Sequence, residues 1–191
     1  MFERFTKDAR DVVKSAFTYV EGGGGGSVEA EHLLLALLDR EGSRGSFALA
    51  ALGLGPDERE PVREALREAR RRAGLSRAES DALAGLGIDV AEIVARVEEV
   101  HGVGAMSGDR KDTRWWSGRP SFGRAAKDVL EGSLRAALAQ RDRHIGDEHL
   151  LLALTVRPGV PAEVLADHGV TYASLVRVLY GAGAGGEAKA G

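Results

Sequence analysis

Apolar residues recur along this chain three and four positions apart, the spacing of an α-helix, and no stretch sustains the two-residue alternation of a strand. The first such stripe follows Thr6, a residue type suited to cap a helix N-terminus. It ends at Glu21, because five consecutive glycines follow and glycine disfavours a helix interior. Further helices are predicted over residues 29–39, 46–55 and 56–72. We therefore expect an all-α fold.

The chain also contains an internal repeat. Residues 5–38 and 122–155 align without a gap, and 11 of these 34 positions are identical. Phe5 corresponds to Phe122, and the run Glu-His-Leu-Leu-Leu-Ala-Leu begins at both Glu31 and Glu148. The glycine run replaces a loop of equal length in the second copy. A repeat at fixed spacing indicates a repeated supersecondary unit. We expect two units of about four helices each, related by a pseudo-two-fold axis, with two equivalent sites.

The two units differ in the number of helices that follow their matching front halves. A segment resembling Leu-x-x-Leu-Gly-Leu precedes an amphipathic helix at residues 49–54, 81–89 and 164–170. The helix after the second of these is predicted to bury Ile93, Val94, Val97 and Val100. The first unit therefore carries its rear helix pair twice, and the second unit carries it once.

These patterns predict four segments: a first unit over residues 1–101, a linker over 102–121, a second unit over 122–181 and a disordered tail over 182–191. The linker holds Trp115 and Trp116, which either pack against the body or form a partner-binding contact.

Composition narrows the function classes. There is no cysteine, so disulfides, thiolate nucleophiles and cysteine-based metal sites are excluded. The net charge of −3 provides no bulk attraction to nucleic acid or to an anionic membrane. The N-terminus lacks the apolar core of a signal peptide, and no apolar run is long enough to span a bilayer. We expect a cytoplasmic protein that binds neither nucleic acid nor membranes.

Three motifs in order carry a resemblance to a known family: Phe-Thr-x-x-Ala at 5–9, Glu-His-Leu-Leu-Leu-Ala-Leu at 31–37 and Leu-x-x-Leu-Gly-Ile at 83–88. They resemble the Clp N-terminal repeat domain, which receives substrates and adaptors for the ClpA/ClpC class of AAA+ unfoldases. The opening Met-Phe-Glu-Arg-Phe-Thr resembles that of actinobacterial ClpC most. The resemblance implies an all-α fold of two four-helix repeats.

The sequence departs from ClpC in two respects. It contains no G-x-x-x-x-G-K-[ST] motif, so there is no phosphate-binding loop for ATP. The additional helix pair of the first unit is atypical of a ClpC N-terminal domain. No nucleophile, base and oxyanion site can be assembled from the sequence. We expect a stand-alone, non-catalytic protein without a cofactor.

The repeated glutamates are the sharpest candidate binding residues. The resemblance implies that Glu31 and Glu148 receive the guanidinium of phospho-arginine, which suits a carboxylate. By sequence position, Arg4 and Thr6 would serve the first site and Lys127 the second. The alternative is structural: a glutamate in the first turn of a helix complements the helix dipole.

The other repeated residues can have either a binding role or a structural role. His32 and His149 could bind metal or act as a base, but no partner stands at ligand spacing such as H-E-x-x-H. We expect them to be half-buried and hydrogen-bonded to a neighbouring loop. The resemblance implies that Phe2, Phe5 and Phe122 belong to a groove that takes adaptors or cyclic peptides. The alternative for Phe5 and Phe122 is a place in the core or its rim.

The preferred function is a protein- or peptide-binding module that modulates Clp-dependent proteolysis as an adaptor or a decoy. Its partners would be a Clp ATPase, adaptors, substrates, phospho-arginine or cyclic peptides. The alternative is a stress-response or regulatory accessory protein with no remaining Clp link.

Overall fold

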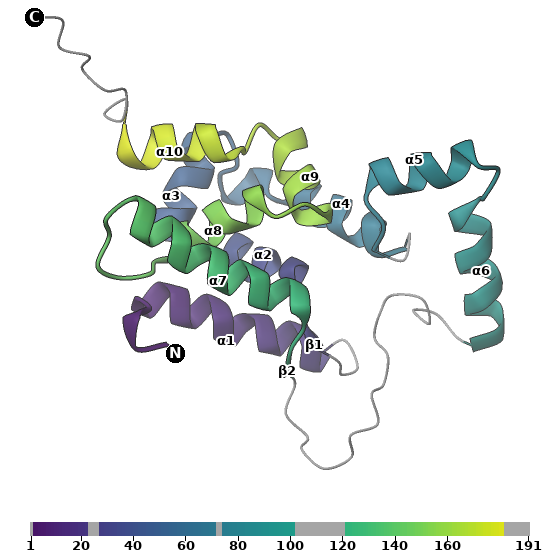
Figure 1. The fold of residues 1–191 in the computed structure, drawn as a ribbon, viewed down its shortest axis with the longest axis horizontal. Helices are drawn as coiled ribbons and strands as arrows, with labels where there is room; N and C mark the ends of the chain where they lie inside the picture. The colour runs from purple at the N-terminus through teal and green to yellow at the C-terminus, as the bar shows by residue number, and fades with distance from the viewer. Residues whose placement is uncertain (1, 23–26, 72–73, 102–120, 182–191) are drawn as a thin grey trace, which may run out of the picture.

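The computed structural model describes residues 2–22, 27–71, 74–101 and 121–181 (Figure 1). Within these residues the fold is all-α, as predicted. The first half contains η1 (Phe2–Arg4), α1 (Lys7–Gly22), β1 (Ser27–Val28), α2 (Ala30–Leu38), α3 (Arg44–Ala51), η2 (Pro56–Glu58) and α4 (Glu60–Arg71). It is followed by α5 (Arg77–Gly85) and α6 (Val90–His101). The second half contains β2 (Ser121–Phe122), α7 (Arg124–Ala139), α8 (Asp147–Val156), α9 (Val160–Asp167) and α10 (Tyr172–Tyr180).

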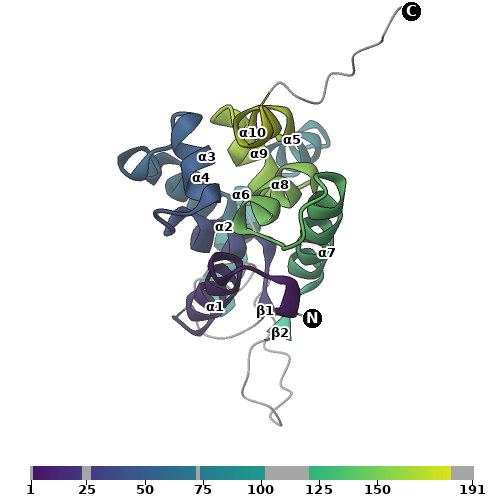
Figure 2. The same ribbon diagram turned by 90° about the vertical axis from the view of Figure 1, so that its left-hand side faces the viewer.

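Helices α1–α4 and α7–α10 follow the same order, and the two sets interlock. Strand β1 pairs in parallel with β2, so that Val28 lies opposite Phe122. An equivalent bridge joins Phe5 to Ile145. The start of each long helix therefore meets the loop that precedes α2 or α8 in the other unit. Figure 2 shows β1 and β2 side by side between α1 and α7.

Helices α2 and α8 form the centre of the core. Leu33 and Leu34 in α2, and the equivalent Leu150 and Leu151 in α8, have no exposed surface. Burial of each such side chain contributes about 1.5–3 kcal/mol. The longer helices α1 and α7 bury one stripe against this centre, as the helical spacing predicts.

The rear helix repeat is visible in its turns. Helices α3, α5 and α9 are each followed by a glycine in the left-handed region. The apolar residue after that glycine donates its N–H to a leucine carbonyl of the helix over 2.9 Å. This geometry is a helix C-cap for which glycine is suited because it lacks Cβ. The three turns contain Gly53 and Leu54, Gly87 and Ile88, and Gly169 and Val170.

Two local predictions need correction. The helix expected over 56–72 begins as the short 3₁₀ helix η2, and the α-helix proper starts only at Glu60. In α6 the predicted inward stripe is largely exposed: Val94 is buried, Val97 is half-buried, and Ile93 and Val100 face solvent. The reason is that α5 and α6 extend away from the bundle (Figure 1) and meet little that could cover them.

Some predicted features lie outside the described residues. They are Gly23 to Gly26, the two tryptophans at 115 and 116, and the tail at 182–191. Of the helices described, none has the length and apolar character needed to cross a membrane.

Candidate functional site

The histidine of each repeated Glu-His pair caps the helix that carries it. His32 and His149 occupy the third position of α2 and α8. Each Nδ1 accepts the backbone N–H of the residue before its helix, Glu29 or Gly146, over 2.9 Å. A side chain at this position that reaches back to the cap residue satisfies a donor that the helix itself cannot pair. The expected hydrogen bond to the loop is present, but both histidines are buried rather than half-buried.

The structure reverses the predicted pairing of helix starts and glutamates. Thr6 caps α1 through its Oγ1, as expected, but its backbone N–H bonds to the carbonyl of Ile145 over 2.9 Å. The N–H of Ile145 in turn bonds to the carbonyl of Arg4. Arg4 and Thr6 therefore lie beside the loop that leads to Glu148, and the prediction that they serve Glu31 is wrong.

The start of α7 makes the matching contact with the first unit. The N–H of Gly123 bonds to the carbonyl of Val28, immediately before α2. Lys127 lies exposed near the start of α7, the end of that helix that meets the loop before α2. No hydrogen bond or ion pair joins Lys127 to Glu31 or Glu148 among the described residues.

A polar cavity of about 270 Å³ lies where the first turn of α1 meets α8. Thr6 and Glu148 both line it, together with Arg44 from the start of α3. The remaining wall residues are Asp8, Asp142, Arg143, His144 and Asp147. Residues from both units thus form one site, which we call the junction cavity.

Glu148 is held in this cavity by a cation from the other unit. Its side chain is 5% exposed, and its Oε1 accepts a hydrogen bond from Nη1 of Arg44 over 3.0 Å. Burial raises the pKa of Glu148 to about 7, although Arg44 opposes that rise. A guanidinium therefore already occupies the position that the family resemblance assigns to a ligand.

Asp142 and Tyr180 complete the polar network around His149. Nε2 of His149 lies 3.0 Å from Oδ2 of Asp142, and the Tyr180 hydroxyl donates to the same oxygen over 3.1 Å. The guanidinium of Arg44 stacks over the Tyr180 ring at 5.4 Å. Burial lowers the pKa of His149, which keeps the imidazole neutral.

Asp142, Glu148 and His149 bring their polar atoms within 4.8 Å of one another, close enough to suggest a metal site. The hydrogen bonding argues against it. Since Nδ1 of His149 accepts the Gly146 N–H, the neutral ring carries its proton on Nε2. A protonated Nε2 donates to Asp142 and has no lone pair for a cation.

Asp147 provides a second link between the units. Its Oδ2 accepts from the Ser43 hydroxyl over 2.5 Å and from the Gly45 N–H over 3.1 Å. The carboxylate thereby adds to the cap of α3 from outside the helix. Sequence reasoning missed Ser43, Arg44 and Gly45 because they stand about a hundred residues from α8 and outside the repeated motif.

The first unit does not reproduce this arrangement. Glu31 is half-buried, and its Oε1 lies 4.0 Å from Nε2 of His32. The side chain of Glu29 covers Gly123, where a Cβ would come within 1.7 Å of its Oε1. Gly123 is the counterpart of Thr6, so a threonine there would clash. The two sites are related by symmetry in backbone only.

The aromatic candidates lie in different surroundings. Phe5 is buried in the core, which agrees with its structural interpretation. Phe122 is half-buried and packs edge-on against Phe17, with ring centroids 4.9 Å apart. Phe2 belongs to η1, and its side chain lies outside the described residues.

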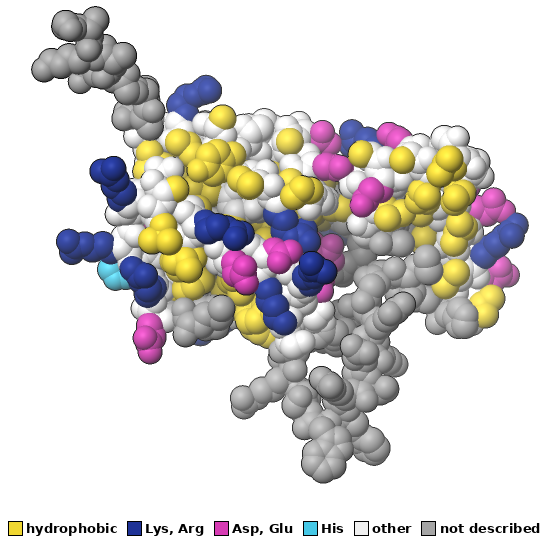
Figure 3. Space-filling view, viewed as in Figure 1, with side chains coloured by type: hydrophobic (Ala, Val, Ile, Leu, Met, Phe, Trp, Pro, Cys, Tyr) yellow, Lys and Arg dark blue, Asp and Glu magenta, His cyan; other side chains and the backbone are white. Residues whose placement is uncertain are grey.

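An apolar groove of about 610 Å³ opens between α7 and α8 on the second unit. Small residues on the facing helices leave this space, since Gly132, Ala136 and Ala153 line it. Val156 also lines it and is 62% exposed. Figure 3 shows hydrophobic side chains gathered over α7 and α10 on this face. We call this the α7–α8 groove.

Comparison with known proteins identifies the fold. Residues 4–84 match the family model of the Clp repeat (R) N-terminal domain. The N-terminal domain of the caseinolytic protease associated chaperone ClpD from Arabidopsis thaliana is 21% identical, with a TM-score of 0.53 over 94% of this chain and 96% of that one. A structure from preliminary investigations of a malarial protein secretion system is 14% identical, with a TM-score of 0.54 over 92% of each chain.

The structural similarity extends over both helical units, whereas the family model matches residues 4–84. The narrower resemblance to actinobacterial ClpC stays a prediction. Residues 4–84 therefore match the Clp repeat (R) N-terminal domain, and the chain shares the all-α fold of the ClpD N-terminal domain.

Proposed function

We propose that this chain binds segments of other proteins and modulates Clp-dependent proteolysis, as an adaptor or as a decoy. The Clp N-terminal domain is a protein-interaction module of Clp ATPases. The sequence contains no phosphate-binding loop, so these 191 residues cannot themselves couple binding to ATP-driven unfolding. A segment that binds clients can deliver them to a protease or withhold them from it.

The observation that carries this proposal is the α7–α8 groove. Its walls are mainly apolar, and Val156 among them is largely exposed. Exposed apolar surface that is contiguous and rimmed by charge is typical of a protein-binding face. Arg135 and the Asp128–Arg157 ion pair supply that rim. An amphipathic helix or an extended apolar segment fits a groove between two helices.

Recognition of phospho-arginine is the less favoured mode at the second site. A ligand guanidinium would have to displace Arg44 from Glu148, and Arg44 is tethered in the same molecule. A tethered group competes at high effective concentration. Glu31, with Lys127 on the neighbouring element, remains the candidate for that ligand in the first unit.

Reconstituted proteolysis tests the proposal. The full chain would be added to the host's Clp ATPase and ClpP with a fluorescent client, and the degradation rate would be measured. An adaptor accelerates degradation of its client, and a decoy slows it. Val156→Ser should weaken either effect, whereas Phe47→Ser, an equally exposed change on α3, should preserve it. An unchanged rate with the wild-type chain, at concentrations well above the Clp hexamer, would contradict the proposal.

A further inference from the structure

Helices α5 and α6 form a hairpin that has almost no core of its own. No side chain of α5 is buried, and in α6 the buried apolar residue is Val94. Two helices with so little buried surface gain little stability from each other. The hairpin is fixed to the bundle at one end, where the backbone N–H of Arg77 bonds to Glu163 and its guanidinium pairs with Asp167 over 3.0 Å.

The apolar residues of the hairpin face solvent instead. Leu86 is 77% exposed and Val100 is 74% exposed, and Ile88 and Ile93 are exposed as well. Figure 3 shows hydrophobic side chains gathered over this part of the molecule, with acidic and basic side chains at its edge. Exposed apolar residues concentrated on one small element indicate a surface that another molecule covers.

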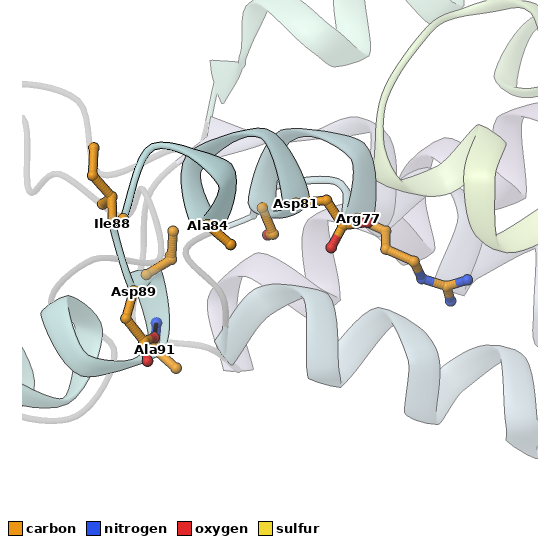
Figure 4. Close-up of a pocket in the computed structure, with 9 residues that line it drawn as sticks. Arg77, Asp81, Ala84, Ile88, Asp89 and Ala91 are labelled. Carbon is orange, nitrogen blue, oxygen red and sulfur yellow. Dashed lines mark hydrogen bonds between the residues drawn. The ribbon is translucent and has the colours of Figure 1, made fainter.

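A cavity of about 550 Å³ lies at the corner between the two helices. Figure 4 shows Ala84 and Asp81 on one side of α5, near the turn that holds Asp89. The carboxylate of Asp89 already has a hydrogen-bond partner in the protein, since its Oδ1 caps α6 by accepting the Ala91 N–H over 2.9 Å. Asp81 forms no hydrogen bond or ion pair with any residue that the structure describes. The corner therefore offers an apolar hollow with an available carboxylate.

Charge distinguishes the hairpin from the rest of the chain. Residues 77–101 contain two arginines and six acidic residues, a net charge of −4, so the other residues together carry +1 of the total −3. Both arginines are engaged: Arg77 pairs with Asp167 as described, and Arg96 pairs with Glu92 over 2.6 Å. The hairpin thus presents apolar side chains with an uncompensated negative field.

We propose that the α5–α6 hairpin is a second docking surface, and that its partner is a basic amphipathic helix of another protein. Apolar side chains of the partner would cover Leu86 and Ile93, and a lysine or arginine would pair with Asp81 at the corner cavity. A second copy of this chain is a poor occupant, because two hairpins of charge −4 repel each other. The surface lies apart from the α7–α8 groove, so it does not depend on the function proposed above.

The test uses the full chain and a fluorescent amphipathic peptide of about 18 residues, built from leucine and lysine at helical spacing. A peptide of the same pattern with glutamate in place of lysine is the control. Fluorescence anisotropy should show saturable binding of the basic peptide, weakened by salt, and none of the acidic one. Leu86→Ser with Ile93→Ser should weaken binding about tenfold or more, and Asp81→Asn about threefold.

The variants change exposed residues, so circular dichroism should show unchanged helix content. Equal affinity of wild type and the Leu86→Ser, Ile93→Ser variant would overturn the proposal. So would binding that is lost in Val156→Ser instead, because that result places the peptide in the α7–α8 groove. Sedimentation of the wild type as a dimer that the double variant dissociates would assign the hairpin to a second copy and overturn the proposal equally.

Discussion

Arg44 donates a hydrogen bond to Glu148 across the junction of the two helical units, with Nη1 3.0 Å from Oε1. The two residues stand 104 positions apart in the chain. The contact holds the start of α3 against the first turn of α8 and closes the junction cavity with a guanidinium of the protein itself. A site that could receive a charged ligand is thereby used to hold the fold together.

The stability of the chain should depend on pH through Glu148. Burial raises its pKa to about 7, so the folded state binds a proton more readily than the unfolded chain. This contribution is fully present below the ordinary carboxyl pKa and is lost as the pH rises through about 7. Glu148→Gln stays neutral. We therefore expect the stability of wild type relative to Glu148→Gln to fall by about 1–3 kcal/mol between pH 5 and pH 8.

Urea unfolding of both proteins over this pH range measures the difference. His149 acts in the opposite direction, since burial lowers its pKa and its contribution is lost as the pH falls below the ordinary histidine value. Both proteins contain His149, so its effect cancels in the comparison. Parallel pH profiles would show that Glu148 is ionised to the same extent in the folded and unfolded states.

Removing Arg44 should open the junction cavity to guanidinium ligands. In Arg44→Ala, Glu148 loses the cation that favours its charged form, so binding is measured above pH 8, where the carboxylate is ionised, while Arg143 remains at the cavity wall to meet a phosphate. We expect phospho-arginine to bind Arg44→Ala about tenfold more tightly than wild type, measured by calorimetry. Adding Glu148→Gln to the same variant should remove the gain. An unaltered affinity would mean that Arg44 does not compete for the carboxylate.

Gly45 should be intolerant of any side chain. A Cβ at this position would lie 2.5 Å from Oδ2 of Asp147, the oxygen that accepts from Ser43 and from Gly45 itself. Gly45→Ala should therefore cost about 1–3 kcal/mol, because Asp147 must move and give up hydrogen bonds. Gly85→Ala is the matched control: it lies in α5 with no atom within 4 Å of its Cβ position, and it should be neutral or slightly stabilising. Thermal unfolding compares the two.

Arg59 should tolerate even lysine poorly. Its guanidinium is buried at the end of α2, where Nη1 donates to the carbonyls of Leu38 and Arg40 over 2.8 Å each. A lysine cannot reproduce the planar fork, and it would leave a buried acceptor unpaired. We expect Arg59→Lys to lower the free energy of unfolding by about 1–3 kcal/mol. Arg67→Lys, on the exposed face of α4, should change the free energy of unfolding by less than about 0.5 kcal/mol. Similar losses for the two variants would show that the hydrogen bonds of Arg59 to the end of α2 do not stabilise the fold.

Much of the fold follows from local sequence signals. The stripe after Thr6 predicts α1, and the glycine that follows each rear helix predicts its C-cap, because both depend on neighbours within one or two turns. The prediction that α6 buries its apolar stripe was wrong because it too used only local signals. Helical spacing identifies an apolar face, but it does not say whether anything in the molecule covers that face.

The site was predicted only in part. The repeat located Glu31 and Glu148, and the capping role of His149 is local enough to follow from its position in the helix. The positions of Thr6, beside the loop before Glu148, and of Glu29, over Gly123, were not foreseen, because they depend on which unit each helix start meets. Gly123 and Gly146 could have signalled it: each stands where its counterpart in the other unit carries a side chain.

The sequence by itself determined the helices, their repeat and the caps that begin and end them, since these are interactions between residues a few positions apart. Only the tertiary structure decided which helix start lies beside which glutamate, and that Arg44 rather than a ligand would meet Glu148. These choices depend on how two similar units interlock around α2 and α8. The packing of the buried leucines sets that arrangement, and it brings together polar residues that no local pattern relates.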